Sequence, residues 1–342
     1  MTQVPSKILL NGLPNLDVRS PAEFEQGHVP GAISFPIFSN DERHQVGLTY
    51  KQTGREEALK VGLDFVDPKM RHWIEKALNI APERKVNMYC WRGGMRSGSM
   101  AWLLKTAGFE VNLIDGGYKT WRKEVLDVIA QPYEYINLAG YTGVGKTELL
   151  HSLKSKGEQI IDLEALANHK GSVFGTNQTP QPTTEHFENM LAFELLSHDR
   201  SMVIWIEDES KSIGSVYLNH LFYNQLTNAP IILINRPIEQ RINYLCTLYG
   251  KKTSDILKAG FKRIERRIGG DQTKAALNYI NTNNLAAAAR IALRYYDKTY
   301  LHSMSRLNRK PMHSQIVQNN QYAEAADQLI KWKKKKNSLI HA

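Results

Sequence analysis

Two short segments of the chain carry residue types that could do chemistry. Residues 90–97 read CWRGGMRS, so a cysteine is followed by two glycines and by Arg92 and Arg96. Residues 140–147 read GYTGVGKT, in which glycines precede a lysine and a threonine. The first pattern favours a reactive thiolate among cations and backbone N–H groups. The second favours a loop that binds phosphate groups. Their presence in one chain predicts an enzyme that couples two chemistries.

The cysteine loop follows an apolar segment, residues 86–90, and precedes a helical pattern over residues 98–106. This order predicts a strand, a loop and a helix whose N-terminal N–H groups point toward the loop. A cysteine in such a loop has a lowered pKa, which makes Cys90 a candidate catalytic nucleophile with Arg92 and Arg96 as anion-binding partners. The alternative is a buried cysteine at a strand end that serves packing alone.

The glycine-rich loop satisfies the Walker A pattern G-x4-G-K-T. It lies between a predicted strand, residues 135–139, and the start of a predicted helix near residue 148. In this pattern the glycines let the backbone close around phosphate oxygens, the lysine neutralises the terminal phosphate, and the threonine hydroxyl binds Mg²⁺. The predicted phosphate-binding residues are Gly140, Gly143, Gly145, Lys146 and Thr147.

An acidic run, residues 207–209, ends the apolar strand pattern of residues 203–206. This is where a Mg²⁺-binding acid stands in proteins with a Walker A loop, so we expect Mg²⁺ to be held by Thr147, Glu207 and Asp208. A solvated acidic turn is the alternative. Because the sequence contains no tidy motif for a nucleotide base, ATP, GTP and another diphosphate ligand all remain open.

The elements that must position these loops alternate between short apolar runs and helical patterns. Such alternation predicts an α/β fold with parallel sheets and helices on both faces. After residue 254 the strand signals fade and helical patterns replace them. We therefore expect three domains, namely an N-terminal α/β domain over residues 1–130, a P-loop α/β domain over residues 131–249 and a basic α-helical module over residues 250–342.

Charge is distributed unevenly along the 342 residues, whose formal net charge is +10. Residues 250–342 hold 19 Lys and Arg against 6 Asp and Glu, whereas residues 131–249 hold 8 against 13. A basic C-terminal region predicts a polyanionic partner, with nucleic acid as the first candidate. Four basic residues share one face of a predicted helix and are candidate nucleic-acid contacts, although a merely solvated face is the alternative. They are Lys262, Arg263, Arg266 and Arg267.

Composition excludes several classes of protein. The chain has two cysteines, Cys90 and Cys246, too few for a disulfide framework or a Cys-rich zinc site. Its longest apolar runs fall far short of the ~20 residues that a membrane-spanning helix needs. Residues 1–7 carry no pattern of a secretory signal. We therefore expect a cytoplasmic protein without a membrane partner.

Further segments around the cysteine loop resemble a rhodanese domain across nearly all of residues 1–128. The usual rhodanese loop places its arginine five positions after the cysteine, whereas Arg96 lies six positions after Cys90, a spacing shared with the phosphatase signature. The longer loop predicts a wider pocket and a phosphate-bearing donor rather than thiosulfate. The segments that carry the resemblance are DVRSPAEF at residues 17–24, GHVPGAI at residues 27–33 and GGY at residues 116–118.

Over almost its full length the chain resembles the tRNA 2-selenouridine synthases, in which rhodanese-like and P-loop halves are joined in this order. In the string at residues 169–175, Lys170 and Val173 depart from the expected arginine and small residue. The other strings that carry the resemblance are at residues 40–43, 46–47, 50–52, 116–119, 207–210 and 295–297.

This resemblance implies the replacement of sulfur by selenium at C2 of 2-thiouridine, at wobble position 34 of the tRNAs for lysine, glutamate and glutamine. It implies two steps, geranylation by geranyl diphosphate and then selenation by selenophosphate. Cys90 would carry selenium as a selenylsulfide or otherwise handle selenophosphate, the P-loop would hold the diphosphate, and the basic module would hold tRNA. Two alternatives remain, a rhodanese- or phosphatase-like sulfurtransferase fused to an ATP-dependent kinase, and a non-catalytic tRNA-binding protein.

Overall fold

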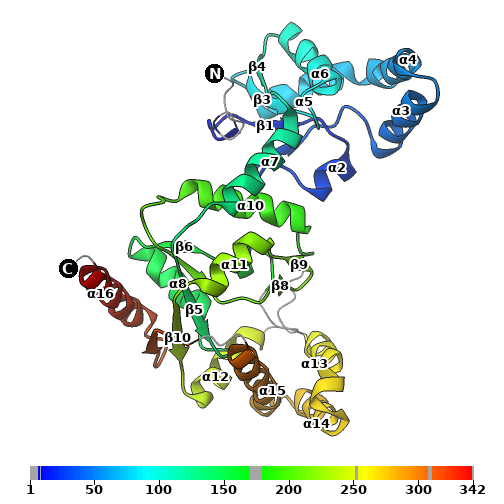
Figure 1. Cartoon of the computed structure of the whole chain (residues 1–342). Helices are drawn as coiled ribbons and strands as arrows, with labels where there is room; N and C mark the ends of the chain where they lie inside the picture. Colours follow the sequence, from blue (N-terminus) through cyan, green and yellow to red (C-terminus); the bar gives the residue numbers. More distant parts are fainter. Residues whose placement is uncertain (1–6, 8, 170–178, 251–252, 307–309, 341–342) are drawn as a thin grey trace. The chain divides into compact units, whose positions relative to one another are not determined.

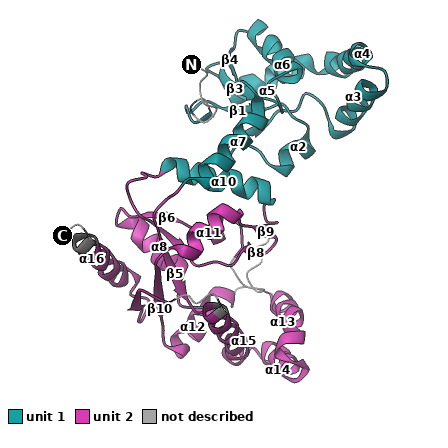
Figure 2. Cartoon of the chain, in the orientation of Figure 1, with its two compact units in different colours: residues 1–131, 183–197 teal, residues 132–182, 198–342 magenta. Residues whose placement is uncertain are grey.

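The computed structural model describes residues 7, 9–169, 179–250, 253–306 and 310–340. The chain forms two compact units (Figure 2). Unit 1 comprises residues 1–131 and 183–197, and unit 2 comprises residues 132–182 and 198–342. The chain therefore leaves unit 2 once, contributes helix α10 (Thr184–Ser197) to unit 1, and then returns.

Unit 1 is built on a four-stranded sheet in the order β2-β1-β3-β4, and all of its strand pairs are parallel. Residues on both faces of the sheet are buried: Leu16 and Met88 lie on one face, and Asp17 and Tyr89 lie on the other. This continuous burial is typical of parallel sheets covered on both sides. The strands are β1 (Asn15–Asp17), β2 (Ile33–Ser34), β3 (Lys85–Tyr89) and β4 (Glu110–Leu113).

Seven α-helices are described in unit 1, and those between β2 and β3 were not predicted from the sequence. Helix α5 buries Trp73 and Ala77 in the same core as the strands, so this insertion is part of the fold. The helices are α2 (Pro21–Gln26), α3 (Asn40–Gln52), α4 (Arg55–Val66), α5 (Met70–Ile80), α6 (Met95–Thr106), α7 (Gly117–Ala130) and α10.

Unit 2 is built on a five-stranded sheet in the order β11-β10-β5-β7-β6, again with parallel pairs. Strands β5, β6 and β10 of this sheet are labelled in Figure 1. Its central strand, β5, is buried along its whole length. A two-stranded antiparallel ribbon, β8 (Ser212–Ile213) with β9 (Val216–Tyr217), lies outside the sheet. The sheet strands are β5 (Tyr135–Gly140), β6 (Gln159–Ile161), β7 (Ile204–Glu207), β10 (Ile231–Asn235) and β11 (His313–Ile316).

The helices of unit 2 fall into two groups, those that flank the sheet and a cluster formed by α13, α14 and α15. The cluster has its own apolar core, in which Phe261, Ile264 and Ala276 are buried. No helix in the described part of the chain is both long and apolar enough to cross a membrane. The helices are α8 (Lys146–Ser155), α9 (Leu163–Leu166), α11 (His220–Asn228), α12 (Ile238–Tyr249), α13 (Ser254–Ile268), α14 (Gly270–Asn281), α15 (Leu285–Arg306) and α16 (Tyr322–Ile340).

The predicted α/β class with two parallel sheets and a helical C-terminal region is confirmed. The compact units nevertheless differ from the predicted division into three domains. Residues 250–342 belong to unit 2, because β11 pairs with β10 and α16 packs against α8 through Ala325, Ala326 and Leu329. Helix α10 was predicted within the P-loop domain, yet it packs against α7 of unit 1.

Candidate functional site

Cys90 follows the end of β3, and its thiol is held in a cradle of hydrogen-bond donors. The side chain is 3% exposed. The hydroxyl of Ser97, a buried residue in the first turn of α6, donates to Cys90 Sγ at 3.2 Å. The backbone N–H groups of Arg92 and Ser97 also favour the charged form of the thiol. The structure therefore brings the loop and the helix N-terminus around the sulfur atom, as the strand-loop-helix pattern predicts.

This cradle decides the protonation of the thiol. Burial raises the pKa of Cys90, but the hydrogen bonds from Ser97 and Arg92 and the charge of Arg96 outweigh it, so the pKa lies below that of an ordinary thiol. Donors that stabilise the charged form of a group favour that form. Cys90 is thus suited to act as a thiolate nucleophile, in the direction that the sequence predicted.

The two arginines of the cysteine loop have different surroundings. Arg96 is half-buried and forms a two-pronged ion pair with Glu23 of α2, at 2.6 Å from Nη1 to Oε2 and 3.2 Å from Nη2 to Oε1. Arg43 of α3 lies 3.8 Å from the same carboxylate. Arg92 is exposed. The loop therefore offers one cation fixed at its edge and one that faces solvent.

The start of α7 supports the cysteine loop from behind. The backbone N–H of Tyr118 donates to Cys90 O at 2.8 Å, and that of Lys119 donates to Trp91 O at 2.9 Å. Gly117 has φ of 58°, and a Cβ at this position would lie 2.3 Å from Cys90 O. Only glycine permits this approach. The GGY string therefore supports the cysteine loop through backbone contacts.

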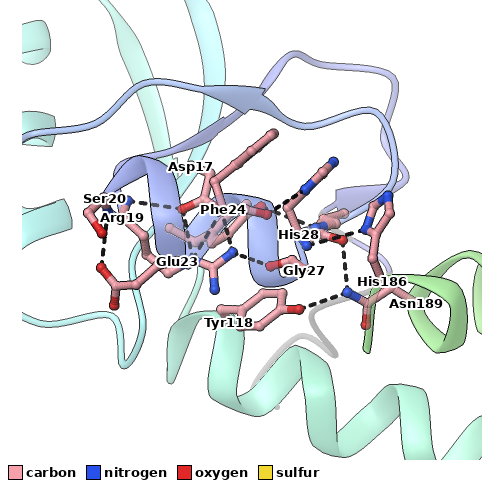
Figure 3. Close-up of polar contacts among 12 residues, drawn as sticks. Asp17, Arg19, Ser20, Glu23, Phe24, Gly27, His28, Tyr118, His186 and Asn189 are labelled. Atoms are coloured by element: carbon pink, nitrogen blue, oxygen red, sulfur yellow. Dashed lines mark hydrogen bonds and ion pairs between the residues drawn. The ribbon is translucent and has the colours of Figure 1, made fainter. Parts of the chain in front are cut away.

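A buried polar network continues from Tyr118 to α10 (Figure 3). The carbon of the Arg19 guanidinium lies 3.7 Å from the centre of the Tyr118 ring, and its Nη2 pairs with Asp17 at 2.6 Å. The Tyr118 hydroxyl donates to Glu185 Oε1 and accepts from Asn189 Nδ2, both at 2.8 Å. Because its ring is fully buried, Tyr118 has a packing and positioning role.

The phosphate loop occupies the turn between β5 and α8 in unit 2, as the Walker A pattern predicts. Gly143 and Gly145 both have φ of 84°, and Gly145 is the residue immediately before α8. Lys146 Nζ donates to Gly140 O at 3.3 Å. All five predicted phosphate-binding residues line one pocket of about 640 Å³. The Lys146 cation and the N-terminus of α8 therefore both face the pocket in which a phosphate group would bind.

Acidic residues surround this pocket in greater number than the sequence predicted. Glu207 is fully buried at the end of β7, and its Oε1 accepts a hydrogen bond from Thr147 Oγ1 at 2.7 Å. Burial, and then the charges of Glu164 and Asp162, raise the pKa of Glu207 well above its ordinary value. Burial likewise raises the pKa of Glu209 to about 8, with Lys146 opposing the rise.

Two of the three predicted Mg²⁺ ligands are in direct contact with each other, and the third lies nearby. Thr147 and Glu207 are in contact, whereas Asp208 lines the same pocket. Within the described ranges no group of three His, Cys, Asp or Glu side chains has the geometry of a metal centre. Mg²⁺ commonly takes only one or two protein oxygens and completes its shell with phosphate oxygens and water. The hydroxyl and carboxylate oxygens present fit that ion, and Glu164, which also lines the pocket, is an acid that sequence reasoning missed.

Two supports of the phosphate loop come from distant parts of unit 2. Arg241 on α12 donates from Nε to Thr142 O at 2.9 Å and pairs with Asp297 of α15. The hydroxyl of Tyr322 on α16 would lie 2.3 Å from a Cβ at Gly145. Sequence reasoning found Asp297 within a family string but assigned it no partner, because the contact spans 56 residues.

The predicted nucleic-acid contacts share one exposed face of α13. Lys262, Arg263, Arg266 and Arg267 are exposed, while Phe261 and Ile264 of the same helix face the apolar core. Arg267 Nη1 donates to the Tyr295 hydroxyl at 2.9 Å. The helix therefore presents the cations together, as their spacing predicts.

Comparison with known proteins covers both halves of the chain. The profile of the tRNA 2-selenouridine synthase AAA domain matches residues 133–336, and that of the rhodanese-like domain matches residues 7–124. A tRNA 2-selenouridine synthase of Sulfurovum sp. (strain NBC37-1) is 37% identical over 291 residues, covering 78% of this chain and 79% of that protein. Those of Bdellovibrio bacteriovorus and Shewanella denitrificans are 36% and 34% identical, over 86% and 88% of this chain and 89% and 90% of their own lengths.

Proposed function

Because the chain belongs to the tRNA 2-selenouridine synthase family, a family of transferases, we propose that it converts 2-thiouridine to 2-selenouridine at wobble position 34 of the tRNAs for lysine, glutamate and glutamine. The observation that carries this proposal is the pairing of two anion-binding loops in one chain. One holds a thiol of lowered pKa, and the other lines a pocket rich in acids.

The first step is alkylation of the thiouridine by geranyl diphosphate. The C2 sulfur attacks C1 of the geranyl group, the C1–O bond breaks, diphosphate leaves, and the proton on N3 is lost. Negative charge grows on the departing diphosphate, so the amides of Gly143 and Gly145 and the cation of Lys146 stabilise the transition state. Thr147 and Glu207 would hold Mg²⁺, which supplies further positive charge to the leaving group when bound.

The second step exchanges the alkylated sulfur for selenium. Selenium from selenophosphate forms the C2–Se bond, the C2–S bond breaks, and geranylthiolate, a far better leaving group than sulfide, leaves and takes up a proton. Water cleaves the P–Se bond, so phosphate is the other product. Cys90 handles the selenium of selenophosphate as a thiolate, while the loop amides and Arg92 bind its phosphate. Arg96 is held in place by its ion pair with Glu23. Its positive charge stabilises the Cys90 thiolate from that position, and it does not need to move toward selenophosphate.

Transfer RNA is the polyanionic partner in this proposal. The cations on α13 neutralise phosphates of the tRNA backbone, which contributes affinity without sequence preference. The wobble base must leave its stack to react, so the free energy of tRNA binding has to offset the cost of unstacking.

Mass spectrometry of nucleosides tests the proposed function. Thiolated tRNA is incubated with the protein, Mg²⁺, geranyl diphosphate and selenophosphate. We expect 2-selenouridine only when both co-substrates are present, and S-geranyl-2-thiouridine when selenophosphate is omitted. ATP hydrolysis without either product would favour a sulfurtransferase fused to a kinase instead.

A further inference from the structure

An apolar cavity of about 60 Å³ lies in unit 2 beside the phosphate loop. Its walls come from α12, α13, α14 and α15, with Phe261, Ile280, Ala288 and Ala292 among the lining residues. These four side chains are at most 6% exposed and belong to the core of the helical cluster. The cavity is therefore part of the cluster's interior.

The cavity adjoins the phosphate pocket. Four residues line both spaces, Thr142 of the phosphate loop, Leu245 and Tyr249 of α12, and Tyr296 of α15. Arg241, which donates to Thr142 O and pairs with Asp297, fixes this shared wall. The polar pocket, where an anionic head would bind the phosphate loop, and the apolar cavity therefore meet at this shared wall.

The residues that line the cavity are mostly apolar, which determines what part of a ligand can bind there. Apart from Thr142, the Cys246 thiol and the two tyrosines, every lining residue is aliphatic, phenylalanine or glycine. Burial raises the pKa of Cys246, which keeps that thiol neutral. A nucleobase carries polar edges that need hydrogen-bond partners when buried, whereas a hydrocarbon needs none.

We propose that this cavity binds the hydrocarbon end of the allylic diphosphate whose head occupies the phosphate loop, an inference that rests on the proposed geranylation. The reacting C1 then lies at the shared wall, between the polar and apolar spaces. The rings of Tyr249 and Tyr296 line this junction, where they exclude water from an allylic carbon that becomes electron-poor as diphosphate departs.

The size of the cavity limits chain length. A closed apolar cavity of about 150 Å³ holds one benzene molecule, so about 60 Å³ holds only the branched end of a chain. The remaining carbons must lie along the shared wall. Phe261 and Ile280 line the cavity but not the phosphate pocket, so they bound the space beyond that end.

Filling the cavity tests the subsite. Ala288→Leu on α15 places a larger side chain in the cavity, and Ala286→Leu makes the same change at an exposed position of the same helix. One methylene in an apolar pocket changes discrimination by roughly 10- to 200-fold. Calorimetry with Mg²⁺ should show geranyl diphosphate binding weakened at least ~10-fold in Ala288→Leu and unchanged in Ala286→Leu. Inorganic diphosphate should bind both variants as it binds the parent protein, which also verifies folding.

Enlarging the cavity gives the opposite test and does not depend on the filled variant folding. Phe261→Leu and the milder Ile280→Val each remove volume from the wall. We expect the ratio of kcat/KM for farnesyl over geranyl diphosphate to rise at least ~10-fold in Phe261→Leu and by less in Ile280→Val. Unchanged chain-length preference in both would overturn the subsite.

The outcomes separate the subsite from the proposed function. If the parent protein geranylates thiolated tRNA and Ala288→Leu binds geranyl diphosphate as well as Ala286→Leu does, the subsite is wrong and the function stands. If the parent protein binds ATP in preference to every allylic diphosphate, the proposed geranylation fails and the subsite fails with it.

Discussion

The cysteine loop of unit 1 and the phosphate loop of unit 2 share one architecture with opposite electrostatics. Each connects a buried parallel strand to a helix N-terminus through a loop with glycine at positive φ, namely Gly93 in the first loop and Gly143 and Gly145 in the second. Around Cys90, hydrogen-bond donors and Arg96 lower the pKa of the thiol. Around the phosphate loop, burial and neighbouring acids raise the pKa values of Glu207 and Glu209. The same backbone device thus serves a nucleophile in one unit and an acid-lined anion site in the other.

This difference teaches what each loop lacks. The thiolate already has its stabilising donors, all supplied by the protein. The phosphate pocket holds buried carboxylates that lack full compensation, and a divalent cation arriving with a diphosphate would supply it. We therefore expect the first step to depend on Mg²⁺ and the second step to depend on the state of the thiol.

Replacing Cys90 should have the largest effect, and it should affect only the step that depends on the cysteine loop. Cys90→Ser should abolish 2-selenouridine, because a serine hydroxyl does not ionise at neutral pH, while geranylation and tRNA binding persist. S-geranyl-2-thiouridine should accumulate in the nucleoside digest. A normal yield of 2-selenouridine would remove Cys90 from the mechanism.

Replacing Lys146 should affect the other step, the one that depends on the phosphate loop. Lys146→Ala removes the side-chain cation from the departing diphosphate, and the loss of such a stabiliser slows a reaction by roughly 10²–10³-fold. The rate of S-geranyl-2-thiouridine formation measures this effect. The variant should still convert RNA that is already geranylated, and wild-type geranylation would show that the diphosphate binds elsewhere.

Neutralising the basic face of α13 should affect both steps alike, which sharpens the comparison with the two loop variants. Glutamine at positions 262, 263, 266 and 267 removes cations that release counterions on tRNA binding. The slope of log affinity against log salt should flatten by roughly 0.7–0.9 for each tRNA phosphate that the protein no longer neutralises. Lys331→Gln with Lys334→Gln on α16, also exposed, is the control and should change the slope less. An unchanged slope in the fourfold variant would mean that this face is only solvated.

The smallest effect concerns stability against pH, and the two loops should give opposite signs. Glu209 keeps its proton up to about pH 8 when folded but loses it near the ordinary carboxyl pKa when unfolded. Its contribution to stability therefore falls as pH rises between those values. Cys90, with its lowered pKa, contributes stability that is lost as pH falls through its folded pKa. Thermal unfolding is measured without Mg²⁺ from pH 5 to 8. The melting temperature should fall less with rising pH in Glu209→Gln than in the parent protein, and an equal fall in both would contradict the raised pKa.

The sequence predicts those parts of the sites that are local. The cysteine loop and the phosphate loop are each a contiguous run, and their strands and helices follow from apolar runs and glycines immediately beside them. The basic face of α13 is local for the same reason, since its spacing lies within one helix.

The rest depends on contacts that no local pattern encodes. Glu23 pairs with Arg96 across 73 residues, and the hydroxyl of Tyr118 bonds to Glu185 across 67. Strand β11 is four residues long with one buried side chain, so its pattern is too short to indicate a place in the sheet. Helix α10 carries no sequence signal that distinguishes packing on α7 from packing on the sheet of unit 2.

The central claim, that two loops run two separable steps, is tested most directly by assaying two variants on two substrates. Cys90→Ser and Lys146→Ala are each given thiolated tRNA and tRNA already geranylated, with all co-substrates, and nucleosides are quantified by mass spectrometry. We predict that Cys90→Ser geranylates the first substrate and selenates neither, whereas Lys146→Ala selenates the second and scarcely geranylates the first. Loss of both steps in both folded variants would contradict the claim, because the two loops would then form one inseparable site.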